Sequence, residues 1–198
     1  MAGRGCRTCL PGVKPSTPGV TSLLRRPESG HDPAMTRPDP LPHLHAAALA
    51  IRETAAPEAG FIALDAALQA AFGHGFFTVM AHEAATGWNR RVYSSRPVKW
   101  PVGGGKPSEG RPFVTQVVHE GRPWTGSGAA AMRFAYPDFA ALEAVGLGSG
   151  LNLPVRAGGV TLGVLNLLHA EGWYTTADVT AGLVFAGLAV PLLQGVAG

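Results

Sequence analysis

Cysteine is almost absent from this 198-residue chain, which contains only Cys6 and Cys9. The two form a single Cys-x-x-Cys pair near the N-terminus, and such a pair supplies only half of the four ligands that a structural zinc ion needs. No cysteine follows it. A folded domain downstream of residue 9 therefore has no intradomain disulfide, no thiolate nucleophile and no cysteine-linked chromophore.

Charged residues are also scarce, at 15% of the chain against roughly 25% in an average globular protein. The chain has 16 basic and 13 acidic side chains, for a net charge of +3. Residues 1–34 hold five of the basic and two of the acidic side chains, so the remaining 11 of each sign cancel. The positive charge belongs to the N-terminal residues, and the rest of the chain gives no electrostatic reason to expect a nucleic-acid partner.

The first 40 residues are rich in proline and glycine and follow neither a helical nor a strand period. They contain too little apolar surface to offset the entropy of ordering them, so we expect a disordered tail over 1–40 and one domain over 41–198. No apolar segment of a secretory signal peptide is present. Met35 stands just before the first predicted helix, and we expect it to be the natural start of the protein.

The remaining sequence predicts an α+β fold. Helices are expected over 41–54, up to 72, over 112–120, over 138–145 with Asp138 as N-cap, and over 176–194. Strands are expected over 76–83, 89–95, 123–125, 149–156 and 160–169. Two of the strand pairs are hairpins, one of them closed by Gly158-Gly159. This order of elements indicates an antiparallel sheet with helices covering its faces.

The segment LGSGLNLPVRAGGVTLGVLNL, residues 147–167, resembles the closing hairpin of a GAF domain. In that pattern a strand ends in Val-Pro-hydrophobic, a glycine turn follows, and the next strand carries hydrophobic-Gly-Val-Leu. The resemblance extends over about 41–195. It implies a central antiparallel sheet of about six strands, with the N- and C-terminal helices on one face and a pocket under crossover helices and loops on the other. Residues 93–97 and 100–107 are most similar to stand-alone bacterial GAF proteins of uncharacterised role.

The resemblance does not identify a ligand, because GAF domains bind cyclic nucleotides, bilins, haem, small aromatics and amino-acid derivatives. One enzymatic branch, the free methionine-R-sulfoxide reductases, and thioether attachment of bilins both need cysteines that residues 41–198 lack. We therefore expect a non-enzymatic, cytoplasmic small-molecule-binding or sensory domain that needs no cofactor. It would act through self-association or a partner. The alternatives are a structural or interaction domain with a filled pocket and no ligand, and a cysteine-free enzyme of unassigned chemistry.

The pocket candidates lie mainly on the crossover, residues 96–140, because loops over a rigid sheet often carry binding groups. Aromatic side chains and a cationic anchor there suit a small anionic or planar ligand, although the aromatics could equally be core residues. The predicted ligand-binding residues are Trp100, Lys106, Trp124, Phe134, Tyr136, Phe139, Asn152 and Asn166. A cavity of about 300 Å³ or more, lined by polar groups, would favour the ligand-binding interpretation over the filled pocket.

The hairpin register decides whether the two asparagines cooperate. A two-residue turn pairs Ala157 with Val160 and leaves Asn152 and Asn166 on opposite faces, whereas a three-residue loop puts both on one face. We favour the two-residue turn because it keeps five apolar side chains together: Leu151, Leu153, Val155, Leu162 and Val164. At most one asparagine is then expected in the pocket.

Other motifs give little functional signal. The histidines are scattered with no i, i+4 pair or nearby carboxylate pattern, so we expect no metal site. The glycines at 103–105 and Lys106 are followed by Pro107 rather than by a helix, unlike a phosphate-binding loop. Residues 179–198 carry no charge, but their glycines and Pro191 favour a buried helix over a membrane span. The surplus apolar surface of that helix predicts a homodimer through the terminal helices, and no membrane partner.

Overall fold

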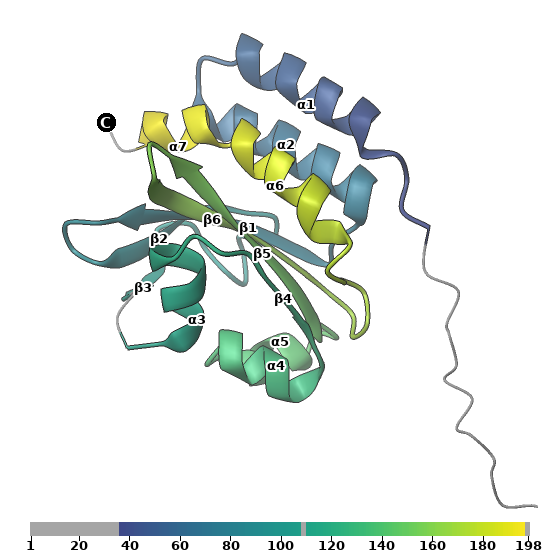
Figure 1. Cartoon of the computed structure of the whole chain (residues 1–198), viewed down its shortest axis with the longest axis vertical. Coiled ribbons are helices and arrows are strands. Elements are labelled where there is room, and N and C mark those ends of the chain that lie inside the picture. The colour runs from purple at the N-terminus through teal and green to yellow at the C-terminus, as the bar shows by residue number, and fades with distance from the viewer. Residues whose placement is uncertain (1–35, 108–109, 197–198) are drawn as a thin grey trace, which may run out of the picture. The chain divides into compact units, whose positions relative to one another are not determined.

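The computed structural model describes residues 36–107 and 110–196 and contains a six-stranded antiparallel sheet (Figure 1). The strand order is β3-β2-β1-β6-β5-β4. The strands are β1 (Phe76–Glu83), β2 (Trp88–Ser94), β3 (Gly105–Pro107), β4 (Trp124–Ser127), β5 (Ser149–Ala157) and β6 (Val160–His169). This architecture confirms the predicted α+β fold. Cys6, Cys9, Met35 and most of the predicted tail lie outside the described residues.

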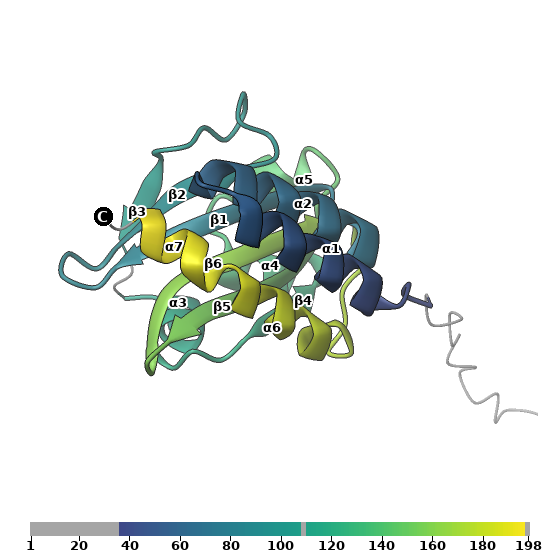
Figure 2. The same ribbon diagram turned by 90° about the horizontal axis from the view of Figure 1, so that it is seen from above.

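Helices cover both faces of the sheet (Figures 1 and 2). One face carries α1 (Pro40–Glu53), α2 (Pro57–Phe72), α6 (Asp178–Leu188) and α7 (Val190–Val196). The other carries α3 (Pro112–Val114), the π-helical turn η1 (Thr115–His119), α4 (Gly128–Ala135) and α5 (Phe139–Glu143). The terminal helices and the crossover helices therefore lie on opposite faces, as the resemblance to GAF domains implied.

Local sequence explains where the two N-terminal helices begin and end. The Asp39 side chain accepts a hydrogen bond from the Leu41 amide, and Pro40 occupies the first turn of α1, where a missing N–H costs nothing. Pro57 starts α2 in the same way. Gly73, with φ of 71°, ends α2 in a conformation that only glycine adopts easily, and the chain turns into β1.

The larger core lies between the sheet and the terminal helices. Side chains of β5 and β6 that point to this face are fully buried against α2 and α6. They are Leu151, Leu153, Val155, Leu165 and Leu167, and they pack with Phe61, Leu64, Leu68 and Phe185. A second cluster of buried residues lies on the opposite face, under the crossover.

The predicted single C-terminal helix is wrong, because two helices, α6 and α7, meet at a 45° bend after Leu188. Pro191 follows the break, lacks an amide hydrogen, and would press its ring against the carbonyl one turn earlier in a continuous helix. In the described part of the chain, no single helix is long and apolar enough to cross a membrane. The bent α6–α7 pair passes that test only when its two helices are counted together.

The predicted separation of the asparagines is also wrong. The Gly158-Gly159 turn does pair Ala157 with Val160, but the register shifts after Thr161, so that Val155 pairs with Gly163. This β-bulge leaves Leu162 as an extra residue on β6 and brings Asn152 directly opposite Asn166. Leu162 consequently packs in the helix-side cluster, whereas Val164 belongs to the cluster under the crossover.

The crossover contains more regular structure than its sequence indicated. Residues 105–107 add an edge strand to β2, and the segment after β4, expected as a loop, forms α4. Asp138 precedes α5, but its side chain makes no capping hydrogen bond, contrary to the prediction, and instead lies 3.5 Å from Lys106 Nζ. That ion pair brings the edge strand to the start of α5.

Candidate functional site

A cavity lies between the sheet and the crossover helices, on the face opposite the terminal helices. Its volume is about 80 Å³, which corresponds to on the order of five to eight water molecules. It is smaller than the 300 Å³ expected for a ligand-binding pocket, so in this conformation it has room only for a small molecule. The lining combines a large apolar surface with several polar groups, which is the composition typical of ligand sites.

The apolar part of the lining comes from alternate residues of the sheet and from the crossover. Phe76 and Met80 of β1 point to this face, as do Val164 and Leu168 of β6. The ring of Trp100 stacks on Phe76 with the ring centroids 4.4 Å apart and the planes tilted by 25°. The helical side adds Val114, Val117, Val118, Ala135 and Leu142.

Polar side chains form a row across the middle of the sheet on the cavity face. The Tyr136 hydroxyl donates to Asn152 Oδ1 at 2.8 Å, Asn152 Nδ2 donates to Asn166 Oδ1, and Asn166 Nδ2 donates to Thr78 Oγ1 at 3.2 Å. The β-bulge in β6 makes this row possible, because it aligns Asn152, Asn166 and Thr78 on three neighbouring strands. Burial raises the pKa of Tyr136, which keeps its hydroxyl protonated and able to donate.

Charged side chains lie where the cavity reaches solvent. Arg91, Lys106 and Arg111 are partly buried, and Asp138 is exposed. Burial lowers the pKa of Lys106, with the positive charges of Arg111 and Arg91 acting in the same direction and Asp138 opposing them. Burial likewise lowers the pKa of both arginines, again opposed by Asp138. Both arginines are therefore close enough to repel Lys106, and all three cations lie near the one carboxylate of Asp138.

Four of the eight predicted ligand-binding residues line the cavity: Trp100, Lys106, Tyr136 and Asn166. Asn152 is completely buried and reaches the cavity only through Tyr136 and Asn166. Trp124 and Phe139 are buried in the core cluster behind the lining. Phe134 is 44% exposed and lies outside the lining, with its ring edge-on to Phe113 at 6.5 Å.

Several lining residues were not singled out from the sequence. Thr78 and Arg91 come from β1 and β2, whose sequence pattern predicts strands but marks neither residue as a lining residue. A second bulge, at Val92, pairs Met80 with Arg91 and turns the arginine toward the cavity. The polar residues of β2 could have indicated this part of the lining, since Asn89 and Arg91 are two residues apart and therefore lie on the same face of that strand.

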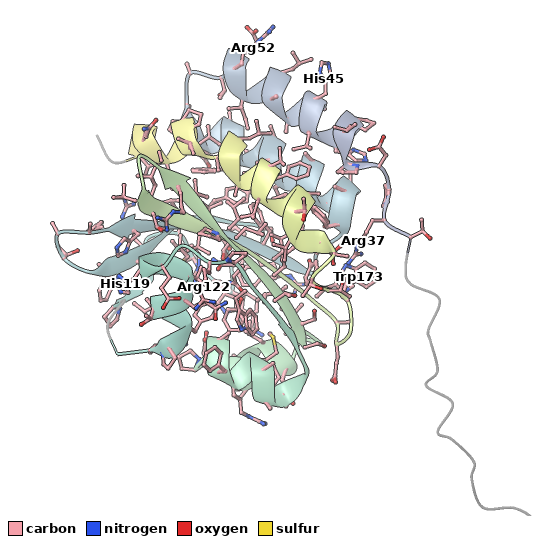
Figure 3. The ribbon with its side chains drawn as sticks, in the orientation of Figure 1. Arg37, His45, Arg52, His119, Arg122 and Trp173 are labelled. Carbon is pink, nitrogen blue, oxygen red and sulfur yellow. The ribbon has the colours of Figure 1, made fainter. Side chains whose placement is uncertain are left out.

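The histidines do not gather into a metal site. Within residues 36–107 and 110–196, no group of three or more His, Cys, Asp or Glu side chains could hold a metal ion. His119 lies on the crossover side of the sheet (Figure 3), with its ring edge-on to that of His82 at 6.2 Å. His74 has a carboxylate partner that is nine residues away in the sequence, since its Nε2 lies 2.8 Å from Asp65 Oδ1.

The Asp65 carboxylate also accepts a 2.6 Å hydrogen bond from the Tyr93 hydroxyl. The group links α2 to β2 and to the segment that precedes β1, on the face away from the cavity. It is therefore a structural connection between a helix and the sheet, and it has no part in the cavity lining.

No protein-family model and no curated protein sequence matches this chain. Solved structures do match it in fold. The GAF domain of an Acinetobacter phosphoenolpyruvate-protein phosphotransferase has a TM-score of 0.64 at 13% identity, covering 79% of this chain and 93% of that one. The corresponding GAF domain from Coxiella burnetii has a TM-score of 0.64 at 14% identity, covering 80% and 92%.

A third structure, a free methionine-R-sulfoxide reductase from Neisseria meningitidis in complex with its substrate, has a TM-score of 0.62 at 15% identity. It covers 80% of this chain and 93% of that chain. The six-stranded sheet and its two helical layers are thus those of a GAF-like domain. At these identities the likeness concerns the fold alone, and domains with this fold typically bind ligands or act as sensors.

Proposed function

We propose that this GAF-like domain is a non-enzymatic sensor that binds a small molecule in the cavity between the sheet and α3–α5. The observation that carries the proposal is the composition of that cavity. A largely apolar space ends in a hydrogen-bonded polar row on one side and in charged groups at the solvent side. Groups placed in this way fix the orientation of a ligand whose body is held by apolar contacts.

The direction of the hydrogen bonds supports ligand binding. From Tyr136 through Asn152 and Asn166 each group donates to the next, and the row ends with Thr78 as an acceptor. Among the described residues, the hydrogen of the Thr78 hydroxyl has no acceptor. An unmade donor facing a cavity is free to bind a polar atom of a ligand.

The output would be a change in assembly or in a partner contact. Ligand uptake would move the crossover helices relative to the sheet, and α6 and α7 cover the opposite face of the same sheet. On α6, Leu183 and Val184 are 38% and 53% exposed, and they form the contact through which we propose that two copies associate. The cavity lining contains no cysteine, which is consistent with binding rather than with sulfoxide reduction.

A structural or interaction domain with a filled pocket is the second candidate. The 80 Å³ volume favours it, and so do the aromatic rings of Phe113, Trp124 and Tyr136, whose centroids lie within 6.3 Å of one another at the wall of the cavity. In this case the apolar space would be a packing defect, and no small molecule would stabilise the domain.

A thermal-shift screen against nucleotides, amino acids and small planar aromatics separates the two candidates. The matched variant is Val164→Phe, which places a larger side chain into the cavity from β6. The sensor proposal expects at least one compound class to raise the melting temperature of the wild-type protein and to have little effect on the variant. Equal shifts in both proteins, or no shift with any class, would favour the filled-pocket domain.

A further inference from the structure

The charges around the cavity mouth are unbalanced. Three cationic side chains, Arg91, Lys106 and Arg111, line it together with the single carboxylate of Asp138. Each cation is partly withdrawn from water, and Arg91 and Arg111 add to the cost of charging Lys106. Placing several positive charges together in a site that is partly withdrawn from water costs free energy, unless a bound anion neutralises them.

The protein itself satisfies only some of the donors in this cluster. Lys106 Nζ lies 3.5 Å from Asp138 Oδ1, and Arg111 donates to the carbonyl of Ala135. Arg91 donates from one terminal nitrogen to the carbonyl of Pro101 at 3.1 Å, but its Nε is buried and has no partner among the described residues. A guanidinium has five N–H donors in a planar fork that matches a carboxylate, so Arg91 has donors to spare.

The apolar lining and the volume of the cavity restrict the part of the ligand that carries the anionic group. The stacked rings of Phe76 and Trp100 and the side chains of Val117 and Val164 offer no hydrogen bonds to a ligand body, apart from the Trp100 N–H. The volume of about 80 Å³ has room for on the order of five to eight water-sized groups, which limits the ligand to a small molecule. That size excludes nucleotides and other large anions in this conformation.

We propose that the ligand is a small carboxylic acid with a compact apolar or aromatic body. Its carboxylate is held by Arg91 together with Lys106 and Arg111, and its body lies against Trp100 and the valines. This inference rests on the proposed function of the same cavity and specifies its ligand class. Asp138 repels the ligand little, because its negative charge is offset by Lys106, whose Nζ lies 3.5 Å away.

Matched acids and amides test the charge requirement directly. Acetate, isobutyrate and benzoate are each compared with the corresponding amide by isothermal titration at low ionic strength. Each pair has nearly the same shape and differs in charge. Charge-assisted hydrogen bonds add enough free energy for the acid that fits the cavity to bind about ten- to a hundred-fold more tightly than its amide.

Variants locate the effect. Arg91→Gln and Lys106→Gln should each weaken binding of that acid about ten-fold or more and leave binding of the amide unchanged. Arg133→Gln is the matched control, because Arg133 is an exposed arginine on α4 that does not line the cavity. Lys106 lies on the short edge strand β3, and the contact that its side chain makes among the described residues is the ion pair with exposed Asp138. Its variant therefore tests the proposal even if Arg91→Gln loses its cooperative melting.

The possible results distinguish the carboxylate site from the broader proposal that the cavity binds a small molecule. Amides that bind as tightly as acids, or acid binding that Arg133→Gln weakens as much as the other variants do, would overturn the carboxylate site and leave the cavity a ligand site. If neither the acids nor the amides bind at millimolar concentration, and the broader thermal-shift screen is also negative, both the carboxylate site and the sensor function are overturned. Binding by the acids alone, lost in the Arg91 and Lys106 variants, supports both.

Discussion

At the residue scale, Arg37 shows how one side chain joins segments that are far apart in the sequence. Its guanidinium pairs with Asp178 of α6 at 2.8 Å and donates to the carbonyls of Phe72 and Trp173. It also lies over the ring of Trp173, 5.2 Å from the centroid, and Figure 3 places the two together. The chain is thus fixed to the domain three residues before α1 begins at Pro40.

Replacing Arg37 by Met should therefore be costly. The side chain of Asp178 is only 3% exposed and would lose its charged partner, so we expect the free energy of unfolding to fall by about 2–4 kcal/mol. Arg52→Met is the control, since Arg52 pairs with Glu53 in the solvent at the other end of α1 (Figure 3). Its effect should stay below about 0.5 kcal/mol. Urea unfolding measures both, and equal effects would contradict the role given to Arg37.

His169 makes the domain sensitive to mild acid. Burial lowers its pKa, as do the positive charges of Arg37 and His74, and its Nδ1 accepts a 2.7 Å hydrogen bond from the Ala170 amide. A histidine with a lower pKa in the folded protein binds its proton more readily when unfolded. Its stabilising contribution is therefore present above the unfolded value of about 6.5 and is lost as the pH falls through the folded pKa.

The variant His169→Gln removes this titration. Between pH 7 and pH 5 its free energy of unfolding should decrease less than that of the wild type, as followed by urea unfolding at each pH. His45→Gln, at an exposed position on α1, is the control and should keep the wild-type slope. A wild-type slope in the His169 variant would mean that other groups cause the acid sensitivity.

At the element scale, β6 is the strand on which the site depends. It lies between β1 and β5 in the sheet, carries the bulge that aligns the asparagines, and approaches β1 closely at Gly163. A Cβ atom at that position would lie 2.2 Å from the Met80 carbonyl oxygen and 2.8 Å from Leu193 Cδ1. Only glycine fits there without moving the backbone.

Gly163→Ala should accordingly lower the free energy of unfolding by about 3 kcal/mol or more, because a backbone carbonyl cannot move aside as a side chain can. Gly187→Ala is the matched control. Gly187 is an exposed residue of α6 with no atom within 4 Å of the added Cβ, and alanine is the better helix former by up to about 1 kcal/mol. That variant should be slightly more stable than the wild type, and a loss of stability would contradict the helix assignment. Thermal or urea unfolding measures both.

The same elements explain how far the sequence alone could predict the structure. Periodicity and turn residues were sufficient for the α+β class and for the two hairpins, because these follow from local chemistry. The faces covered by the terminal and crossover helices were expected from the resemblance to GAF domains. The two bulges were not predictable, since a single extra residue in β6 or β2 leaves the hydrophobic pattern almost unchanged. The pairing of Asn152 with Asn166 and the placement of Arg91 both depend on them. The lining residues of the crossover were predicted only in part, because composition does not say which way a side chain points. Trp124 and Phe134 belong to the same aromatic-rich segment, yet Trp124 is buried and Phe134 is exposed.

At the scale of the whole molecule, the sheet separates two layers that differ in their packing. The terminal helices enclose the larger core, and the crossover encloses the cavity. Signals from the cavity would reach other proteins through the outer surface of α6, where Leu183 and Val184 remain exposed. A sensor built in this way needs a second surface besides its ligand site, and a second copy of the chain is the partner that we propose.

Light scattering at micromolar concentration should accordingly give twice the chain mass of 20.5 kDa. Val184→Glu introduces a charge into the proposed interface and should give the single mass without loss of helical circular dichroism. Val98→Glu is the control, because Val98 is fully exposed on the loop between β2 and β3. A monomeric wild-type protein, or a dimer that Val184→Glu leaves intact, would contradict an interface through α6.

The indole N–H signals of the four tryptophans provide the most direct test of the cavity as the ligand site. Trp100 lines the cavity, whereas Trp173 lies on the other side of the molecule's core and donates its Nε1–H to the Phe72 carbonyl at 2.8 Å. Nitrogen-15 correlation spectra are recorded while the compound that most raises the melting temperature is added. The Trp100 signal should move with saturating amplitude while the Trp173 signal stays in place. A Trp100 signal that is unchanged at saturation would contradict the account.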